Sequence, residues 1–148
     1  MATVVELDVP GRIDVVDDLE AVVVQLGTRG GLDPDASHFL GVALREALMN
    51  AIRHGNGAAG GSPIQARIAL DEGCLSLTVR DWGPGFEAEA LPDPEALENC
   101  CLGCGRGVFF MRRFADEVVF HRPEGGGQIV ELRKRLRPAQ VLELDRQA

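Results

Sequence analysis

Three polar residues stand four positions apart in an otherwise apolar stretch: Glu46, Asn50 and His54. If the stretch is helical, this spacing puts their side chains on one face, each one turn above the last. A glutamate there could accept a proton or orient a hydroxyl group. The carbonyl oxygen of Asn50 suits Mg²⁺ when phosphate oxygens and waters supply the other ligands. On spacing alone, the same pattern also fits a solvated polar stripe on a surface helix.

A second group is the sequence DWGPGF at 81–86, which directly follows a segment of alternating apolar and polar residues. The carboxylate of Asp81, at the end of a strand, could accept a hydrogen bond from an exocyclic amine. Gly83 and Gly85 would let a flat ligand approach the backbone. The same residues also make an ordinary turn, so this motif alone decides nothing.

A third group is the sequence GCGRG at 103–107, which opens a short apolar segment. Backbone N–H groups at the start of a helix form an anion site, and Gly105 and Gly107 would admit a phosphate. No Gly-Lys-Ser/Thr follows, so the motif is not a Walker A loop. It follows a loop rather than a strand, so it is not a dinucleotide-binding fingerprint either.

Residue periodicity predicts the elements that must position these groups. Helices are predicted over residues 13–26, 36–53 and 106–115. Strands are predicted over residues 3–8, 64–70, 74–80, 116–122 and 128–136. We expect one domain over residues 1–148, an α/β two-layer sandwich with a mixed, mostly antiparallel sheet of about five strands and three helices on one face. The hairpins require antiparallel pairing, which argues against a doubly wound parallel sheet.

The composition narrows the classes of partner. Acidic residues outnumber basic ones by 23 to 15, which gives a net charge of −8. We therefore expect no direct nucleic-acid binding and no adhesion to an anionic membrane. No run of about 18 apolar residues occurs, and no basic region followed by an apolar core stands at the N-terminus. These features predict a cytoplasmic protein with reduced thiols.

Three cysteines, Cys100, Cys101 and Cys104, fall within five positions. Cys101 and Cys104 have the spacing of a zinc pair, but four well-spaced ligands are missing. A redox-sensitive loop and incidental thiols are the other interpretations of this segment.

The last predicted strand ends in a basic run of Arg133, Lys134, Arg135 and Arg137. On an acidic protein, such a run is typical of a solvated edge strand. Contact with a phosphate or a partner is the alternative.

Taken together, the order and spacing of the three motifs resemble the GHKL superfamily of ATP-binding proteins, which includes gyrase, a class of heat-shock chaperones, histidine kinases and MutL. The segments REALMNAIRHGN, VRDWGPGF and GRGVFFMRRFADEVVFHRPEGGGQIVELRKRL further resemble bacterial anti-sigma factor serine kinases. This similarity covers about residues 10–137.

The resemblance implies an ATP pocket between the helices and the sheet, covered by a lid at residues 87–104. By position, Asn50 would bind the Mg²⁺ that bridges the phosphates. Asp81 would accept a hydrogen bond from the adenine amino group. Glu46 matches the general base that would act on a serine hydroxyl of a partner protein.

The glycine motifs would shape the rest of the pocket. The resemblance implies that Gly83 and Gly85 form the wall around adenine and ribose. Gly105 and Gly107 would cradle phosphate at the start of a helix. Arg106, between them, would bind the γ-phosphate, or else be a solvent-exposed arginine at the helix start.

The implied function is an anti-sigma regulatory factor with serine kinase activity. Such a protein would bind ATP and Mg²⁺, sequester a sigma factor or similar regulator, and phosphorylate a small anti-anti-sigma (STAS-type) antagonist. Relatives of this kind are commonly homodimers. The alternatives are a regulator that sequesters its partner without phosphoryl transfer, a detached histidine kinase catalytic domain, and a nucleotide sensor without a sigma partner. The absence of a phospho-acceptor helix pair argues against the histidine kinase.

Overall fold

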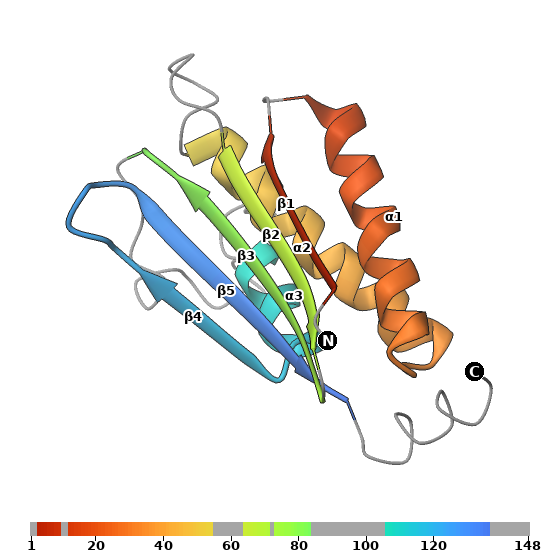
Figure 1. Ribbon diagram of the computed structural model, residues 1–148. Helices are drawn as coiled ribbons and strands as arrows, with labels where there is room; N and C mark the ends of the chain where they lie inside the picture. Colours follow the sequence, from red (N-terminus) through yellow and green to blue (C-terminus); the bar gives the residue numbers. More distant parts are fainter. Residues whose placement is uncertain (1–2, 10–11, 55–63, 72, 84–105, 137–148) are drawn as a thin grey trace.

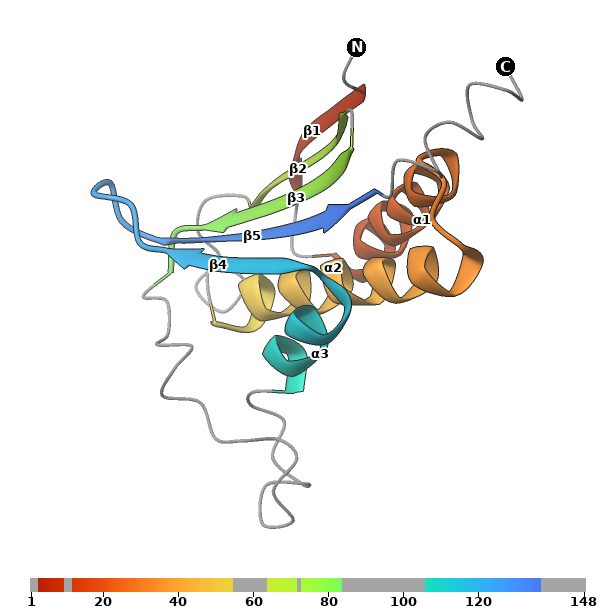
Figure 2. The same cartoon turned by 90° about the horizontal axis from the view of Figure 1, so that it is seen from below.

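The computed structural model describes residues 3–9, 12–54, 64–71, 73–83 and 106–136. These residues form two layers: a five-stranded sheet and three helices that all lie on one face of it (Figures 1 and 2). The expected α/β sandwich is therefore confirmed.

All pairs of described strands are antiparallel. The sequence predicts a mixed, mostly antiparallel sheet, and no parallel pair occurs among these strands. The strands follow the order β1-β2-β3-β5-β4 across the sheet. They are β1 (Thr3–Val9), β2 (Ile64–Asp71), β3 (Cys74–Asp81), β4 (Glu117–His121) and β5 (Gln128–Arg135). Each predicted strand is thus found within one or two residues of its expected ends.

Alternation decides which side chains of the central strand reach the core. In β3, Leu75, Leu77 and Val79 are buried against the helices, and the residues between them are only half-buried. The same alternation turns Asp81, the last residue of β3, toward the helices. A charged residue therefore ends an otherwise apolar row beneath the helical layer.

The helices are α1 (Ile13–Arg29), α2 (Pro34–His54) and α3 (Arg106–Phe114). α1 ends where Gly30 donates its N–H to the Leu26 carbonyl and Gly31 adopts a φ of 90°, which favours glycine. α2 begins after Asp33, whose carboxylate accepts the N–H of Ala36 at 2.8 Å. This cap satisfies a backbone donor that the first turn leaves unpaired.

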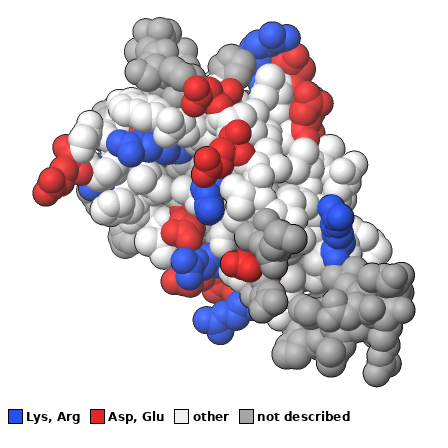
Figure 3. Space-filling view, viewed as in Figure 1, with Lys and Arg blue, Asp and Glu red and all other residues white. Residues whose placement is uncertain are grey.

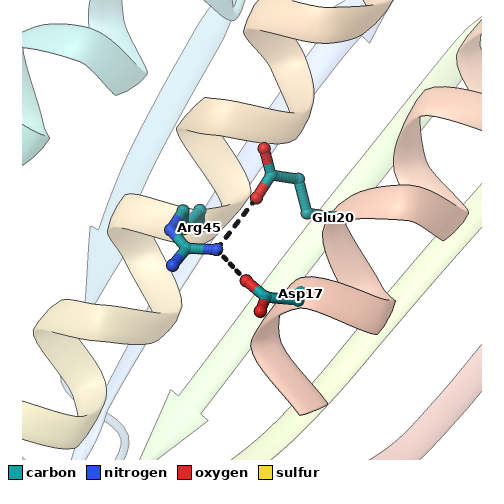
Figure 4. Close-up of polar contacts among 3 residues, drawn as sticks. All are labelled: Asp17, Glu20 and Arg45. Carbon is teal, nitrogen blue, oxygen red and sulfur yellow. Dashed lines mark hydrogen bonds and ion pairs between the residues drawn. The ribbon is translucent and has the colours of Figure 1, made fainter. Parts of the chain in front are cut away.

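An ion-pair cluster joins α1 to α2. Nη1 of Arg45 on α2 donates to Asp17 and, at 3.1 Å, to Glu20, both on α1 (Figure 4). These hydrogen bonds raise the pKa of the Arg45 guanidinium. Gly41 lets the helices approach closely, because a Cβ there would lie 3.2 Å from Cγ of Glu20. The cluster fixes the register of α2, the helix that carries Glu46 and Asn50.

The prediction that the last strand lies at an edge is wrong. β5 pairs with β3 on one side and β4 on the other. Two of its basic residues are also paired with acids: Arg133 with Glu131 at 2.7 Å, and Lys134 with Asp116 at 3.5 Å. On the sheet face away from the helices, cationic and anionic side chains are interspersed (Figure 3). Arg137 lies outside the described residues.

No helix in the described part of the chain combines the length and the apolar character needed to cross a bilayer.

Candidate functional site

Two of the predicted site residues meet the start of α3. Glu46 and Asn50 lie one turn apart on α2 and are half-buried. Gly107, the second residue of α3, packs directly on both. A Cβ at position 107 would lie 3.0 Å from Oε2 of Glu46 and 3.2 Å from Nδ2 of Asn50. Glu46 and Asn50 are therefore partly covered by the first turn of α3 rather than fully solvated.

This arrangement makes a cradle for an anion. The first turn of a helix has backbone N–H groups without partners inside the helix, and the helix dipole adds partial positive charge there. Because Gly107 has no side chain, the helix start can lie directly against Glu46 and Asn50. An amide oxygen from Asn50 beside phosphate oxygens is a donor set that suits Mg²⁺. The residue types at this point thus fit a Mg²⁺-phosphate group, with the Asn50 amide turned so that Oδ1, rather than the Nδ2 that faces Gly107, reaches the metal.

Asp81 is held at the end of β3. Its side chain is only 8% exposed, and Oδ1 accepts the N–H of Gly83 at 2.9 Å. This local turn orients the carboxylate toward the helical layer. Asp81 and Gly83, both predicted site residues, therefore belong to one turn, in which the Gly83 N–H positions the Asp81 carboxylate.

A small pocket between the sheet and the helices brings the first two motifs together. Its polar lining is Asn50, Asp81 and Gln128, and the rest is apolar: Ala47, Ala51, Val79, Met111, Phe120 and Val130. The lining combines apolar side chains with a few convergent polar groups, as small-molecule sites do, but the pocket has a volume of about 10 Å³, the room of one water, so a larger ligand must widen it. Glu46 does not line this pocket. It lies beside it, under Gly107.

Gln128 is a site residue that the sequence analysis missed. It stands opposite Asp81 in the pairing of β3 with β5 and is only 5% exposed. The signal was present: a polar residue occupies the inward position of an alternating row whose next members are Val130 and Leu132. Recognising it required knowing that β5 pairs with β3.

The turn before β5 approaches Asp81 very closely. Gly127 has a φ of 82°, and a Cβ there would lie 2.0 Å from the carbonyl oxygen of Asp81 and 2.8 Å from Cα of Trp82. No other amino acid could occupy this position without moving the backbone. Gly127 therefore holds the end of β3 against the start of β5, where Asp81 and Gln128 meet.

Several predicted site residues fall outside the described residues: Gly85, Gly105, the lid at 87–104 and its cysteines. Arg106 is described as the first residue of α3, but its side chain is not. The same holds for His54 at the end of α2. Among the described residues, no group of three or more His, Cys, Asp or Glu side chains could hold a metal ion. The proposed Mg²⁺ role of Asn50 needs no such group.

Comparison with known proteins agrees with this geometry. The histidine kinase-like ATPase domain family matches residues 9–134. The chain is 28% identical over 120 residues to an anti-sigma F factor of Geobacillus kaustophilus (strain HTA426), covering 75% of this chain and 79% of that protein. It is 29% identical over 112 residues to an anti-sigma F factor of Geobacillus stearothermophilus, covering 70% and 73%.

A solved structure shares the fold. A chain in the crystal structure of the SiaB–SiaC complex from Pseudomonas aeruginosa superposes with a TM-score of 0.59 at 14% identity, covering 88% of this chain and 89% of that one. The family match spans most of the sequence, including the second helix, the strand that ends in Asp81 and the short helix that begins at Arg106. The chain therefore belongs to the histidine kinase-like ATPase domain family.

Proposed function

We propose that this protein is an anti-sigma regulator that binds ATP with Mg²⁺ and phosphorylates a serine of a small STAS-type antagonist protein. Membership of an ATPase domain family supports nucleotide binding. The relatives named anti-sigma F factors, matched over about three quarters of each chain, support the regulatory role. Sequestration of a sigma factor and assembly as a homodimer are part of the same proposal.

The pocket supports a specific placement of ATP. The adenine ring would lie where this pocket meets the end of β3, with the Asp81 carboxylate accepting from its exocyclic amine and Gln128 facing the same ring; the pocket, at about 10 Å³, must widen to admit it. The phosphates extend toward the start of α3, where backbone N–H groups beside Gly107 bind them. The carbonyl oxygen of Asn50 would hold Mg²⁺, and the ion would supply neutralisation of charge on the phosphate oxygens.

Glu46 supplies the chemistry that Mg²⁺ and backbone dipoles cannot. A serine hydroxyl has a pKa far above 7, so its proton must leave as the oxygen attacks phosphorus. The Glu46 carboxylate lies one turn from Asn50, close to the proposed phosphate position but outside the adenine pocket. Glu46 can therefore accept the serine proton without helping to hold the adenine ring. The remaining catalysis is positioning and electrostatic stabilisation.

One observation carries this proposal: Gly107 contacts both Glu46 and Asn50. A module that only sequestered a partner would need the nucleotide pocket, but it would not need a carboxylate under the phosphate cradle. The convergence of base, metal ligand and helix start at one point is what phosphoryl transfer requires.

The test separates binding from chemistry through Glu46→Gln. This change keeps the side-chain shape and removes the proton acceptor. We expect ATP affinity near that of the parent by calorimetry, while transfer from labelled ATP to purified STAS-type proteins falls by about 10²–10⁴-fold. Glu117→Gln, at an exposed position of β4, is the matched control and should change neither quantity.

Two results would contradict the assignment. If Glu46→Gln loses ATP affinity and transfer together, Glu46 is structural. If the parent chain transfers no phosphate to any STAS-type protein yet binds ATP and a sigma factor, the protein acts by sequestration alone.

A further inference from the structure

The side of α2 that carries Glu46 and Asn50 also carries an exposed aromatic residue, Phe39. Phe39 lies seven positions before Glu46, and Asn50 lies four positions after it. Because an α-helix has 3.6 residues per turn, these three side chains fall on the same side of α2. Glu46 and Asn50 are half-buried, whereas Phe39 is 39% exposed. The row therefore begins at the surface, two turns before the proposed base.

α3 lies along this row in the opposite direction. Its second residue, Gly107, contacts Glu46. Its last residue, Phe114, stacks on Phe39 with ring centroids 4.4 Å apart and ring planes within 8° of parallel. Seven residues separate the two contacts on each helix, which corresponds to about 10 Å at 1.5 Å per residue. One pair of packed helices thus connects a surface aromatic cluster to the proposed catalytic end.

We call Phe39, Phe110 and Phe114 the aromatic platform. Phe110 lies 6.0 Å from Phe114 with its ring plane 12° from parallel, and the His38 ring lies 5.4 Å from Phe39. Phe110 and Phe114 are half-buried, so part of each ring faces water together with Phe39. Grouped apolar surface of this kind gains free energy when a partner covers it.

The charge beside the platform is positive. α3 has three arginines and no acidic residue, although the chain as a whole has a net charge of −8. Arg113 is exposed, adjacent to Phe114 and three positions from Phe110, which makes it a neighbour of the platform on the helix surface. No described residue forms an ion pair with it. Asp35, one turn before Phe39, is exposed at the other end.

We propose that the aromatic platform and Arg113 form the docking surface for the protein substrate, a proposal that rests on the kinase function above. The docking segment carries an apolar side chain next to a carboxylate: the apolar group covers Phe39, and the carboxylate pairs with Arg113. Asp35 repels a carboxylate at the opposite end and so fixes the direction of the segment. About three residues of extended chain span the 10 Å from the platform to Glu46, so a docked substrate can reach the base.

Two variants test this surface, each with a matched control. Phe39→Glu places a charge on the platform, and Val119→Glu places the same charge at a residue of β4 that is 44% exposed on the sheet. Arg113→Glu reverses the charge beside the platform. Arg112→Glu makes the same change on the opposite side of α3, because Arg112 stands two positions from both Phe110 and Phe114. Far-UV circular dichroism checks that each variant is folded.

The probes are the purified STAS-type proteins encoded in the source genome, titrated against the parent chain with ATP and Mg²⁺. For a protein that binds, we expect Phe39→Glu and Arg113→Glu each to weaken affinity at least tenfold, and both controls to change it less than twofold. In the transfer assay, KM for that protein should rise by the same factor. The kcat at saturating substrate and the affinity for ATP should stay at parental values.

The outcomes distinguish this proposal from the kinase proposal. If folded Phe39→Glu and Arg113→Glu bind like the parent, if the controls weaken binding equally, or if no STAS-type protein binds the parent, the docking surface is wrong. If a protein binds through the platform and is never phosphorylated, the docking surface stands and the kinase proposal fails. If transfer occurs with an unaltered KM in both variants, the kinase proposal stands and the docking surface fails.

Discussion

Gly107 lies so close to Glu46 that a methyl group at position 107 would come within 3.0 Å of the carboxylate oxygen Oε2. The same methyl group would lie 3.2 Å from the side-chain nitrogen of Asn50. A helix start on one element therefore shares its space with two polar side chains on another. This contact places the proposed base, metal ligand and phosphate cradle within one small volume, and the first prediction perturbs it directly.

Gly107→Ala should lower the affinity for ATP while leaving the free energy of unfolding nearly unchanged. Alanine favours a helix over glycine by about 1 kcal/mol, and the neighbouring carboxylate and amide can shift by a few tenths of an ångström. We expect the free energy of unfolding in urea to stay within about 1 kcal/mol of the parent. ATP affinity should fall by about 5- to 30-fold, because the methyl group pushes the Asn50 amide and the Glu46 carboxylate away from the helix start that is proposed to bind the phosphates. Gly125→Ala, whose Cβ has only ordinary contacts, should change neither quantity.

Asp81→Asn should weaken adenine recognition. The change replaces one carboxylate acceptor with an amide, of which one end is a donor, so the cost in ATP binding should be about 1–3 kcal/mol. Competition of GTP against labelled ATP measures selectivity for the base. GTP competing as well as ATP against the parent chain would show that Asp81 does not read adenine. Asp8→Asn, at an exposed position of β1, is the control.

Asn50→Ala should remove the Mg²⁺ dependence of nucleotide binding. Asn50 is the only protein oxygen assigned to the metal, and the pocket keeps its adenine contacts without it. Calorimetry with and without Mg²⁺ should show a marked metal effect on ATP affinity in the parent and little or none in the variant. An equal metal effect in both chains would rule out Asn50 as the ligand.

Gly127→Ala should destabilise the fold more than the same change at the preceding residue. Both glycines have positive φ, at 82° and 93°, so each alanine adopts a strained backbone at a cost of about 1–2 kcal/mol. Only at position 127 does the Cβ also meet backbone atoms, 2.0 Å from the Asp81 carbonyl oxygen; at Gly126 nothing lies within 4 Å. We expect Gly126→Ala to cost about 1–2 kcal/mol and Gly127→Ala at least about 3 kcal/mol in urea unfolding. Equal costs would mean that the turn moves away from Asp81 freely.

Most of the fold could be predicted because local periodicity determined it. The alternation from Cys74 to Asp81 and the three- and four-residue spacing of apolar residues in α1 are properties of short segments. The position of β5 in the sheet could not be predicted in this way. Its basic end is typical of an edge strand, but strand order depends on contacts between distant segments, and ion pairs with Glu131 and Asp116 balance the charges of Arg133 and Lys134.

In the candidate site, too, the residues that could be predicted are those whose positions depend on a single element. Glu46 and Asn50 could be paired from sequence because they share one helix, and Asp81 could be identified from its place at a strand end. Gln128 and the approach of Gly127 to Asp81 could not, because both depend on the pairing of β3 with β5. The contact of Gly107 with Glu46 likewise requires the packing of α3 on α2, which no local spacing encodes.

The interior position of β5 also has a consequence for how the protein forms during synthesis. Of the strands in the described part of the chain, β5 leaves the ribosome last, yet it lies between β3 and β4. Until it inserts, β3 presents an open edge that can pair with other chains, and Asp81 has no partner strand. Closing this long-range pairing is slow compared with forming the helices. The candidate site is therefore completed only once β5 has been synthesised, in the same step that covers the open edge of β3.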